Sequence, residues 1–145
     1  MDDKTAFDLR LFLPYLLNQA AEASSLAFQQ VYKDRYGMLR SEWRVLFHLG
    51  IYGEMTASDI AARSRIHKTK ISRAVQRLVQ RRFVIRRRDP QDRRAEWLSL
   101  TTAGRAAYAD LRQVAQQYEA DLTAGIDPAE VARLRDTLQR LAGDT

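Results

Sequence analysis

One stretch of this chain, residues 67–82 (HKTKISRAVQRLVQRR), restricts the possible folds more than any other. Its apolar residues recur at the spacing of an α-helix, so one face of that helix must be buried. These apolar residues are Ile71, Val75 or Ala74, Leu78 and Val79. Most remaining positions are Lys or Arg, and no acidic residue occurs between Asp59 and Asp89 to neutralise them. The stretch therefore predicts a helix that packs against a hydrophobic core with one face and binds a polyanion with the other.

The distribution of charge along the chain supports this interpretation. Residues 63–94 contain thirteen Lys or Arg and two Asp, a local charge of +11. Because the whole chain carries +6, the remaining residues together carry −5. A basic middle between acidic flanks is typical of a nucleic-acid-binding surface on a folded body. A merely solvated helix usually mixes both signs of charge.

The composition excludes several other classes of protein. A chain of 145 residues is one domain, or one compact unit with extensions. The absence of cysteine excludes a disulfide scaffold, a thiolate zinc finger and a thiol redox sensor. No signal-peptide pattern is present, and no apolar run approaches the roughly 18 residues that span a bilayer. We therefore expect a cytoplasmic protein without a membrane partner.

Catalytic chemistry is not predicted. An enzyme would need a nucleophile or an acid–base pair, but the chain has only two histidines, far apart, and no Gly-rich phosphate loop. No cluster of residues has the spacing of metal ligands. We therefore predict no catalytic residues, no cofactor and no metal site.

Two helices are predicted before the short helix that leads to residues 67–82. Apolar residues from Leu9 to Val31 predict a long helix over residues 5–35, and Pro14 indicates a kinked start or a separate turn. Gly37 should end this helix in the left-handed conformation. Ser41 is predicted to be the N-cap of a second helix over residues 42–52.

The next segment predicts a helix-turn-helix. Residues 56–59 (TASD) match the capping-box pattern and should start a short helix over residues 58–64. A brief turn at residues 65–66 separates it from the basic helix. Two short helices joined by such a turn, the second of them basic, are typical of DNA-binding proteins.

A β-hairpin is predicted directly after the basic helix. Residues 83–85 are rich in β-formers and residues 95–100 alternate between apolar and polar. The loop between them, residues 86–94, contains the turn signal Asp89-Pro90 and five arginines. A hairpin in this place is a wing, in which some arginines pair with aspartate and others reach phosphates or a minor groove.

The C-terminal part predicts two further helices. Thr101 should cap the first, and Gly104 lies in its first turn, where a side chain would obstruct the wing. Asp127, Pro128 and Glu130 are the starting signals of the second helix. These helices and the N-terminal one are amphipathic and carry no motif chemistry. We expect them to pair two subunits, with ordinary core packing as the alternative.

The most specific motifs are the wing sequence DPQDRR at residues 89–94 and LTTAG at residues 100–104. In these motifs the chain resembles the MarR (multiple-antibiotic-resistance regulator) family of winged helix-turn-helix transcription factors. Residues 41–46 (SEWRVL) and 71–78 (ISRAVQRL) also match. The chain departs from the family pattern at His67, where Ser is usual, and at Arg82, where Gly is usual.

The resemblance implies a mainly α fold with a small antiparallel β-hairpin wing. Residues 1–145 would form a single unit, with a winged helix-turn-helix over residues 39–101 and dimerisation helices over residues 1–36 and 102–145. It further implies a homodimer that binds double-stranded DNA at a pseudo-palindromic operator and regulates transcription, as a repressor. The alternative is a winged-helix module that binds protein without operator specificity, but such a module would not need the concentrated positive charge.

The predicted site has two parts. The predicted DNA contacts are Lys68, Thr69, Lys70, Ser72, Arg73, Gln76, Arg77, Arg86, Arg88, Arg93 and Arg94. Of these, Arg73 and Arg77 are predicted to read bases, because Arg binds guanine in a bidentate manner. The resemblance also implies an effector pocket for an aromatic carboxylate, with Arg44, His48, Trp43, Tyr15 and Tyr36 as its candidate residues. The alternative is that His48 and Arg44 have structural roles only.

Overall fold

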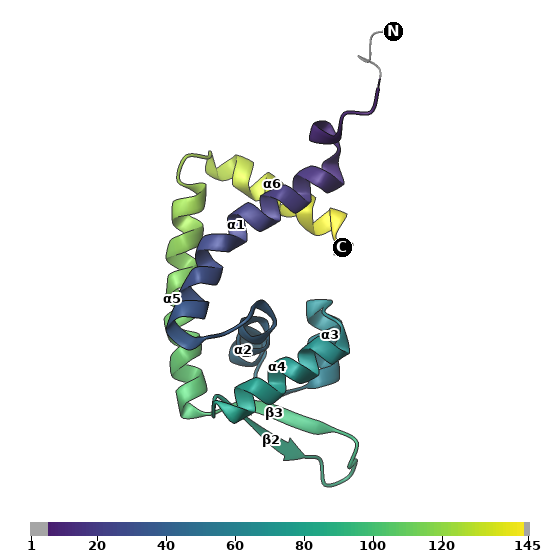
Figure 1. The fold of residues 1–145 in the computed structure, drawn as a ribbon, viewed down its shortest axis with the longest axis vertical. Helices are drawn as coiled ribbons and strands as arrows, with labels where there is room; N and C mark the ends of the chain where they lie inside the picture. The colour runs from purple at the N-terminus through teal and green to yellow at the C-terminus, as the bar shows by residue number, and fades with distance from the viewer. Residues whose placement is uncertain (1–5, 144–145) are drawn as a thin grey trace. The chain divides into compact units, whose positions relative to one another are not determined.

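The computed structural model describes residues 6–143, which are mainly helical with one small antiparallel sheet (Figure 1). This confirms the predicted fold class. The chain divides into two compact units, Met1–Arg112 and Gln113–Thr145, within helix α5. The elements in chain order are the 3-10 turn η2 (Leu9–Leu11), α1 (Leu13–Tyr36), α2 (Arg40–Tyr52), β1 (Met55–Thr56), α3 (Ala57–Ser64), α4 (Lys68–Gln80), β2 (Val84–Arg88), β3 (Glu96–Leu100), α5 (Thr102–Thr123) and α6 (Pro128–Leu141).

Both ends of α1 follow from local residues. Pro14 lies in the first turn, where a missing backbone N–H costs nothing, and η2 precedes the helix as a separate turn. The predicted interruption at Pro14 is therefore confirmed, whereas residue 5, the predicted start, lies outside the described residues. Gly37 ends α1 with φ 62°, and its N–H donates to the Lys33 carbonyl at 2.8 Å.

The predicted N-cap of α2 is wrong. The helix begins at Arg40, so Leu39 occupies the N-cap position and Ser41 already lies within the helix. The carboxylate of Glu42 reaches back and accepts the Leu39 N–H at 2.6 Å. A carboxylate three residues into a helix can thus cap it without a hydroxyl side chain.

Helices α2, α3 and α4 pack around one apolar core in the first unit. The α3 cap is as predicted, because the Thr56 hydroxyl accepts the Asp59 N–H at 3.1 Å. Each of the three helices contributes residues that are almost completely buried. They are Val45 and Leu46 from α2, Ile60 from α3, and Ile71 and Leu78 from α4. This core fixes the orientation of α4 relative to α2 and α3.

The sheet has the strand order β1-β3-β2 and is antiparallel throughout. Two sequence predictions about it are wrong. Phe83 precedes β2 rather than belonging to it, and residues 86–88 lie in β2 rather than in the loop. Pairing with β3 continues from Val84 opposite Leu100 to Arg88 opposite Glu96, so the backbone ladder overrides the polar side chains. Strand β1 was not predicted, because two residues show no alternation.

The start of α5 is packed tightly against the root of the wing. The Thr101 hydroxyl accepts the Gly104 N–H at 3.0 Å, as predicted for its cap. A Cβ at Gly104 would lie 2.1 Å from the carbonyl oxygen of Phe83. Only glycine is therefore compatible with this contact, which confirms the expected obstruction.

Helix α6 starts as predicted. Asp127 is its N-cap and accepts the Ala129 N–H at 2.9 Å, with Pro128 in the first turn. Of its apolar stripe, Val131 is buried, whereas Leu134, Leu138 and Leu141 are exposed.

Candidate nucleic-acid interface

Helix α4 buries one face and exposes a basic one. The buried side chains are Ile71, Ala74, Val75 and Leu78, and Val79 is half-buried. All the helix positions predicted to contact DNA are exposed; they are Lys68, Thr69, Lys70, Ser72, Arg73, Gln76 and Arg77. The predicted division of the helix into two faces is confirmed.

The two positions that depart from the family pattern lie at the ends of α4. At the start, Nδ1 of the His67 ring accepts the Thr69 N–H at 3.1 Å, so an imidazole makes the N-cap where a hydroxyl is usual. Just beyond the helix, Arg82 has φ 64°, the left-handed conformation for which glycine is usual. This conformation costs a non-glycine residue roughly 1 kcal/mol. Arg65, before α4, is also left-handed with φ 59°.

The strands of the wing are held by ion pairs. Nη2 of Arg87 lies 2.6 Å from Oε1 of Glu54, in the turn between α2 and β1, and this hydrogen bond raises the pKa of Arg87. Arg86 lies 3.7 Å from Glu96 on the neighbouring strand. The predicted internal pairing of wing arginines is thus present, although Glu rather than Asp supplies the partner.

The wing loop is braced through its backbone. Asp89 accepts the Gln91 N–H at 2.9 Å and the indole N–H of Trp97 at 3.3 Å, and these two hydrogen bonds lower the pKa of Asp89. Asp92 accepts the backbone N–H of Arg94 at 3.0 Å. Asp92 therefore braces Arg94 through the main chain, and the guanidinium of Arg94 is not paired with that aspartate.

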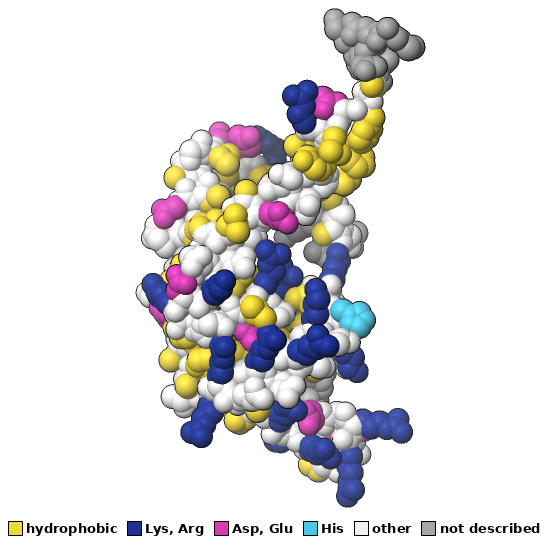
Figure 2. All heavy atoms as spheres, viewed as in Figure 1, with side chains coloured by type: hydrophobic (Ala, Val, Ile, Leu, Met, Phe, Trp, Pro, Cys, Tyr) yellow, Lys and Arg dark blue, Asp and Glu magenta, His cyan; other side chains and the backbone are white. Residues whose placement is uncertain are grey.

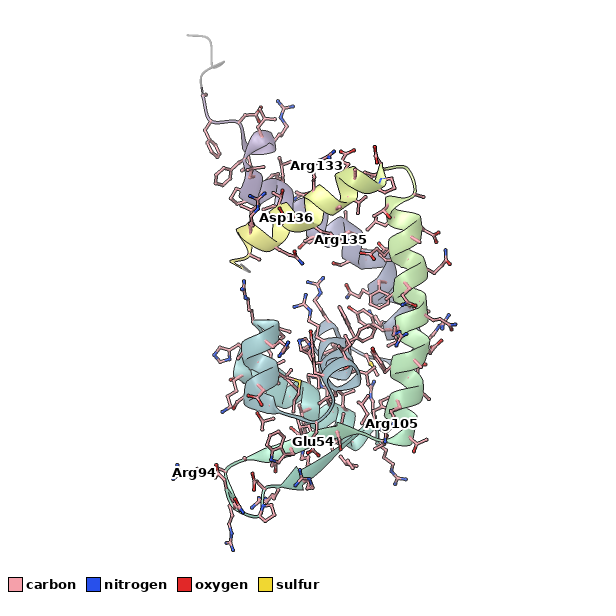
Figure 3. All side chains as sticks on the ribbon, turned by 180° about the vertical axis from the view of Figure 1, so that it is seen from behind. Glu54, Arg94, Arg105, Arg133, Arg135 and Asp136 are labelled. Atoms are coloured by element: carbon pink, nitrogen blue, oxygen red, sulfur yellow. The ribbon has the colours of Figure 1, made fainter. Side chains whose placement is uncertain are left out.

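Cations gather over α4 and the wing in the space-filling view (Figure 2). Arg94 lies at the outer end of the wing and Glu54 beside the strands (Figure 3). Among residues 6–143, Arg88, Arg93 and Arg94 have no carboxylate partner. The wing therefore presents three uncompensated arginines from an internally braced hairpin.

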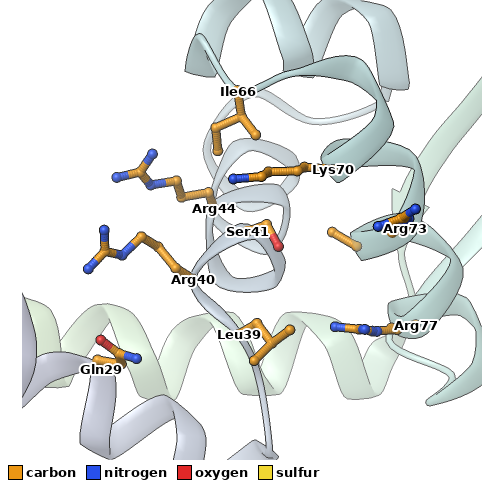
Figure 4. Close-up of a pocket in the computed structure, with 10 residues that line it drawn as sticks. Gln29, Leu39, Arg40, Ser41, Arg44, Ile66, Lys70, Arg73 and Arg77 are labelled. Carbon is orange, nitrogen blue, oxygen red and sulfur yellow. The ribbon is translucent and has the colours of Figure 1, made fainter.

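An open hollow of about 560 Å³ lies between the start of α2 and the basic helix α4 (Figure 4). Cationic side chains from both helices line it: Arg40, Arg44, Lys70, Arg73 and Arg77. Leu39, Ile66 and Ala74 provide apolar wall. Burial, followed by the repulsion of Arg40, lowers the pKa of Arg44. This hollow can accept an anion that also has an apolar part.

The structure brings three of the five predicted effector residues together on α2, namely Trp43, Arg44 and His48, with the Arg44 guanidinium 5.9 Å from the centroid of the Trp43 ring. Arg44 lines the hollow, whereas the other four do not. His48 donates through Nδ1 to the Arg44 carbonyl at 2.6 Å, within its own helix. Tyr36 donates to Asp110 at 2.6 Å, at the junction of α1 and α5.

The remaining two aromatic candidates, Trp43 and Tyr15, do not line the hollow. Trp43 packs edge-on against Phe28 and Phe47, at centroid distances of 5.4 and 5.1 Å, in an aromatic cluster between α1 and α2. Tyr15 is exposed on α1. Sequence spacing placed Arg44 and His48 on one face but could not show that Trp43 packs into that cluster.

Two glutamates at the site were not predicted. Glu54 holds Arg87 across 33 positions of the chain, and Glu42 lies within 3.8 Å of Arg77. The position of Glu42 three residues into a helix signals a cap, but a sequence cannot show which arginine lies beside it. Pairs so far apart in the chain become neighbours only through packing.

The described part of the chain offers neither a membrane span nor a metal centre. Across residues 6–143 no helix combines the length and the hydrophobicity needed to cross a bilayer. The same residues contain no group of three His, Asp or Glu side chains arranged to hold a metal ion.

Comparison with known proteins identifies the family. The sequence profile of the MarR family matches residues 36–95, which run from the end of α1 through the wing loop. Over these residues the chain matches the MarR family. The predicted resemblance is thereby confirmed, and the chain is a transcriptional regulator of the winged helix-turn-helix type. Family and fold are those of regulators rather than enzymes.

Individual known proteins are similar over most of the chain. The homoprotocatechuate degradative operon repressor of Escherichia coli is 28% identical over 116 residues, covering 77% of this chain and 78% of the repressor. The structure of Bordetella bronchiseptica BpsR, solved to study regulation of its DNA binding by 6-hydroxynicotinic acid, is 25% identical with a TM-score of 0.81, covering 90% and 98% of the two chains. A mutant of Escherichia coli MarR in complex with operator DNA has a TM-score of 0.82 at 23% identity, covering 94% and 97%.

Proposed function

We propose that this MarR-family regulator binds a pseudo-palindromic operator as a homodimer and represses transcription. The observation that carries the proposal is the exposed basic face of α4 beside an internally braced wing with free arginines. The MarR mutant complexed with operator DNA, which has the same fold, supports it. Because DNA is the proposed partner, the cytoplasm is the proposed location.

The proposed contacts divide between the two elements. In α4, Arg73 reads a base edge, while Lys68, Thr69, Lys70, Ser72 and Gln76 hold the helix against phosphates or neighbouring bases. In the wing, Arg93 and Arg94 reach the backbone or the minor groove, with Arg86 and Arg88 along the strand. Residues 39–101 are the proposed DNA-binding region.

The proposed dimer is formed by residues 1–36 and 102–145. Apolar side chains that a monomer would leave exposed support this assignment. At the start of the chain they are Phe7, Leu9, Leu11, Phe12 and Leu13, and in α6 they are Leu134, Leu138 and Leu141. Apolar patches of this kind are typical of subunit interfaces. Leu134→Glu combined with Leu138→Glu should yield monomers by light scattering.

The proposed effector is an aromatic carboxylate that enters the hollow beside Arg44. A carboxylate would pair with the cations there, and a ring would lie on the apolar wall. Lys70 and Arg73 belong both to the hollow and to the proposed DNA contacts, so a bound anion would weaken DNA binding. A panel of aromatic acids should release DNA from the wild type but not from Arg44→Ala; release from neither protein would reject the effector.

Arg73→Ala tests the DNA-binding proposal. Affinity for a genomic fragment selected by the wild type should fall about tenfold to a hundredfold, while affinity for a random duplex falls much less. Arg112→Ala, a change of an exposed arginine in α5, is the matched control. Fluorescence anisotropy at several salt concentrations measures both. Equal affinity of Arg73→Ala and wild type for the selected fragment would overturn the assignment.

A further inference from the structure

Beneath the basic face of α4 lies the carboxylate of Glu42, the one buried carboxylate among residues 6–143. Its side chain is 1% exposed, although Glu is among the residues least often buried. One oxygen, Oε2, caps α2 by accepting the Leu39 N–H at 2.6 Å. The other oxygen, Oε1, is buried and accepts no hydrogen bond within the described part of the chain. A cap alone would explain one oxygen and leave the second unexplained.

The cation that faces this second oxygen is Arg77. Its Nη1 lies 3.8 Å from Oε1 of Glu42, and its side chain is 49% exposed. In the close-up of the hollow, the side chain of Arg77 extends from α4 toward Leu39 at the start of α2 (Figure 4). Arg77 is therefore drawn toward the α2 side rather than directed freely outward from the helix.

We propose that Glu42 is a positioning residue that restrains Arg77 and thereby sets the ratio of specific to non-specific DNA binding. This inference rests on the proposed function. A buried carboxylate needs a compensating cation, and among residues 6–143 Arg77 is the one within ion-pair distance of Glu42. While Arg77 is paired with Glu42, its positive charge is not available to bind DNA phosphates. Arg73, for which no carboxylate partner is present among residues 6–143, remains the reader.

The restraint matters for discrimination because free cations act on all DNA alike. Each phosphate that a protein neutralises releases counterions and strengthens binding whatever the base sequence. An arginine released from Glu42 would therefore raise affinity for random DNA more than for an operator. Removing a buried negative charge from beneath α4 should make the protein a tighter but less selective binder.

Glu42→Gln tests this, because the amide oxygen can still accept the Leu39 N–H while the charge is lost. The logarithmic salt slope for a random duplex should steepen by about 0.9 for each subunit. For a dimer, the loss of affinity for the random duplex between about 50 and 200 mM salt would then be about ten times larger than the loss for wild type. The preference for the selected fragment over the random duplex should shrink. Glu119→Gln, which frees Arg135 in the second unit by the same change of charge, is the control.

Arg77→Gln provides a second readout if Glu42→Gln does not fold. Restrained by Glu42, Arg77 contributes little to the salt slope, so Arg77→Gln should leave the slope for a random duplex unchanged, while Lys68→Gln, at a proposed phosphate contact, lowers it. Equal losses of slope in Arg77→Gln and Lys68→Gln, or an unchanged slope in folded Glu42→Gln, would overturn the inference. Failure of the wild type to bind DNA at all would instead reject the proposed function.

Discussion

Helix α4 and the wing both present cations to a nucleic acid, but they gain their rigidity in different ways. The helix is held by its own backbone bonds and by a buried stripe, and its single carboxylate neighbour among the described residues lies underneath it. The wing has only Val84, Leu98 and Leu100 buried, and it depends on Glu54, Glu96, Asp89 and Asp92 for its shape. The carboxylate beneath the helix therefore holds one arginine away from the DNA, whereas the carboxylates around the wing fix the orientation of the wing.

The largest expected effect comes from separating the wing from its support. In Gly104→Ala the new Cβ would lie 2.1 Å from the Phe83 carbonyl, so the root of β2 or the start of α5 must move. Overpacking of this kind should cost about 3 kcal/mol of unfolding free energy. Urea unfolding followed by circular dichroism measures this.

The control for Gly104→Ala is Gly125→Ala, because a Cβ there has no atom within 4 Å. Helix α4 keeps its own hydrogen bonds in both variants, so a stable Gly104→Ala protein should lose wing contacts with DNA before helix contacts. Equal unfolding midpoints for the two alanine variants would contradict the claim that the wing root is tightly packed.

The same contrast explains which features were predictable. The faces of α4 follow from local spacing, and so do the caps at Thr56 and Asp127 and the left-handed Gly37. Each of these depends on residues fewer than five positions apart. The wing was predicted as a hairpin, but its strand length was wrong because backbone pairing with β3 carries three arginines into β2.

Contacts across the fold were not predictable from the sequence. The ion pair of Arg87 with Glu54 and the hydrogen bond of Tyr36 with Asp110 join residues 33 and 74 positions apart. The packing partners of the predicted effector residues Tyr36 and Trp43 were not predictable for the same reason. The basic face of the site was therefore predictable, whereas the pairing of its arginines with Glu54 and Glu42 was not.

A smaller effect is expected from loosening the wing while leaving its root intact. Glu54→Gln removes the carboxylate that holds Arg87 at 2.6 Å, so the hairpin should sample more orientations. Affinity for the selected DNA fragment should fall about threefold, since exposed ion pairs contribute little individually. The thermal midpoint should hardly change. Fluorescence anisotropy and a thermal melt provide the two readouts.

Glu54→Gln sharpens the comparison because Glu42→Gln should act in the opposite direction on random DNA. Both substitutions remove one negative charge beside an arginine, one under the helix and one beside the wing. If affinity for the random duplex rose in both variants, Glu54 would only neutralise the charge of Arg87 and would not orient the wing. The distinction between withdrawing and orienting carboxylates would then fail.

The smallest effect concerns Tyr36, where the end of α4 and the root of the wing meet. Its carbonyl accepts a hydrogen bond from Arg81, its ring lies edge-on to Phe83 at 6.0 Å, and its hydroxyl donates to Asp110. Burial, together with the Asp110 carboxylate, raises the pKa of Tyr36 to about 12. The same hydrogen bond, followed by that from Arg35, lowers the pKa of Asp110.

These shifts fix the pH range over which the hydroxyl stabilises the fold. The pKa of Tyr36 is higher in the folded state, so its contribution is complete below about pH 10 and is lost as pH rises toward about 12. The pKa of Asp110 is lower in the folded state, so its contribution is present above about pH 4 and is lost as pH falls further. Tyr36→Phe keeps the ring against Phe83 and removes the hydroxyl. Because both groups are only half-buried and solvent screens their interaction, the loss at neutral pH should stay below about 1 kcal/mol.

The measurement is the difference in unfolding free energy between wild type and Tyr36→Phe across the pH range. The difference should be largest near neutral pH and shrink toward both ends, because either protonated Asp110 or ionised Tyr36 weakens the hydrogen bond in the wild type. Tyr15→Phe, in which an exposed tyrosine of α1 without a hydrogen-bond partner among residues 6–143 is changed, should give no such profile. A constant difference at all pH values would mean that the Tyr36 hydroxyl acts only through packing, and that helix and wing are joined at this point by the Arg81 and Phe83 contacts alone.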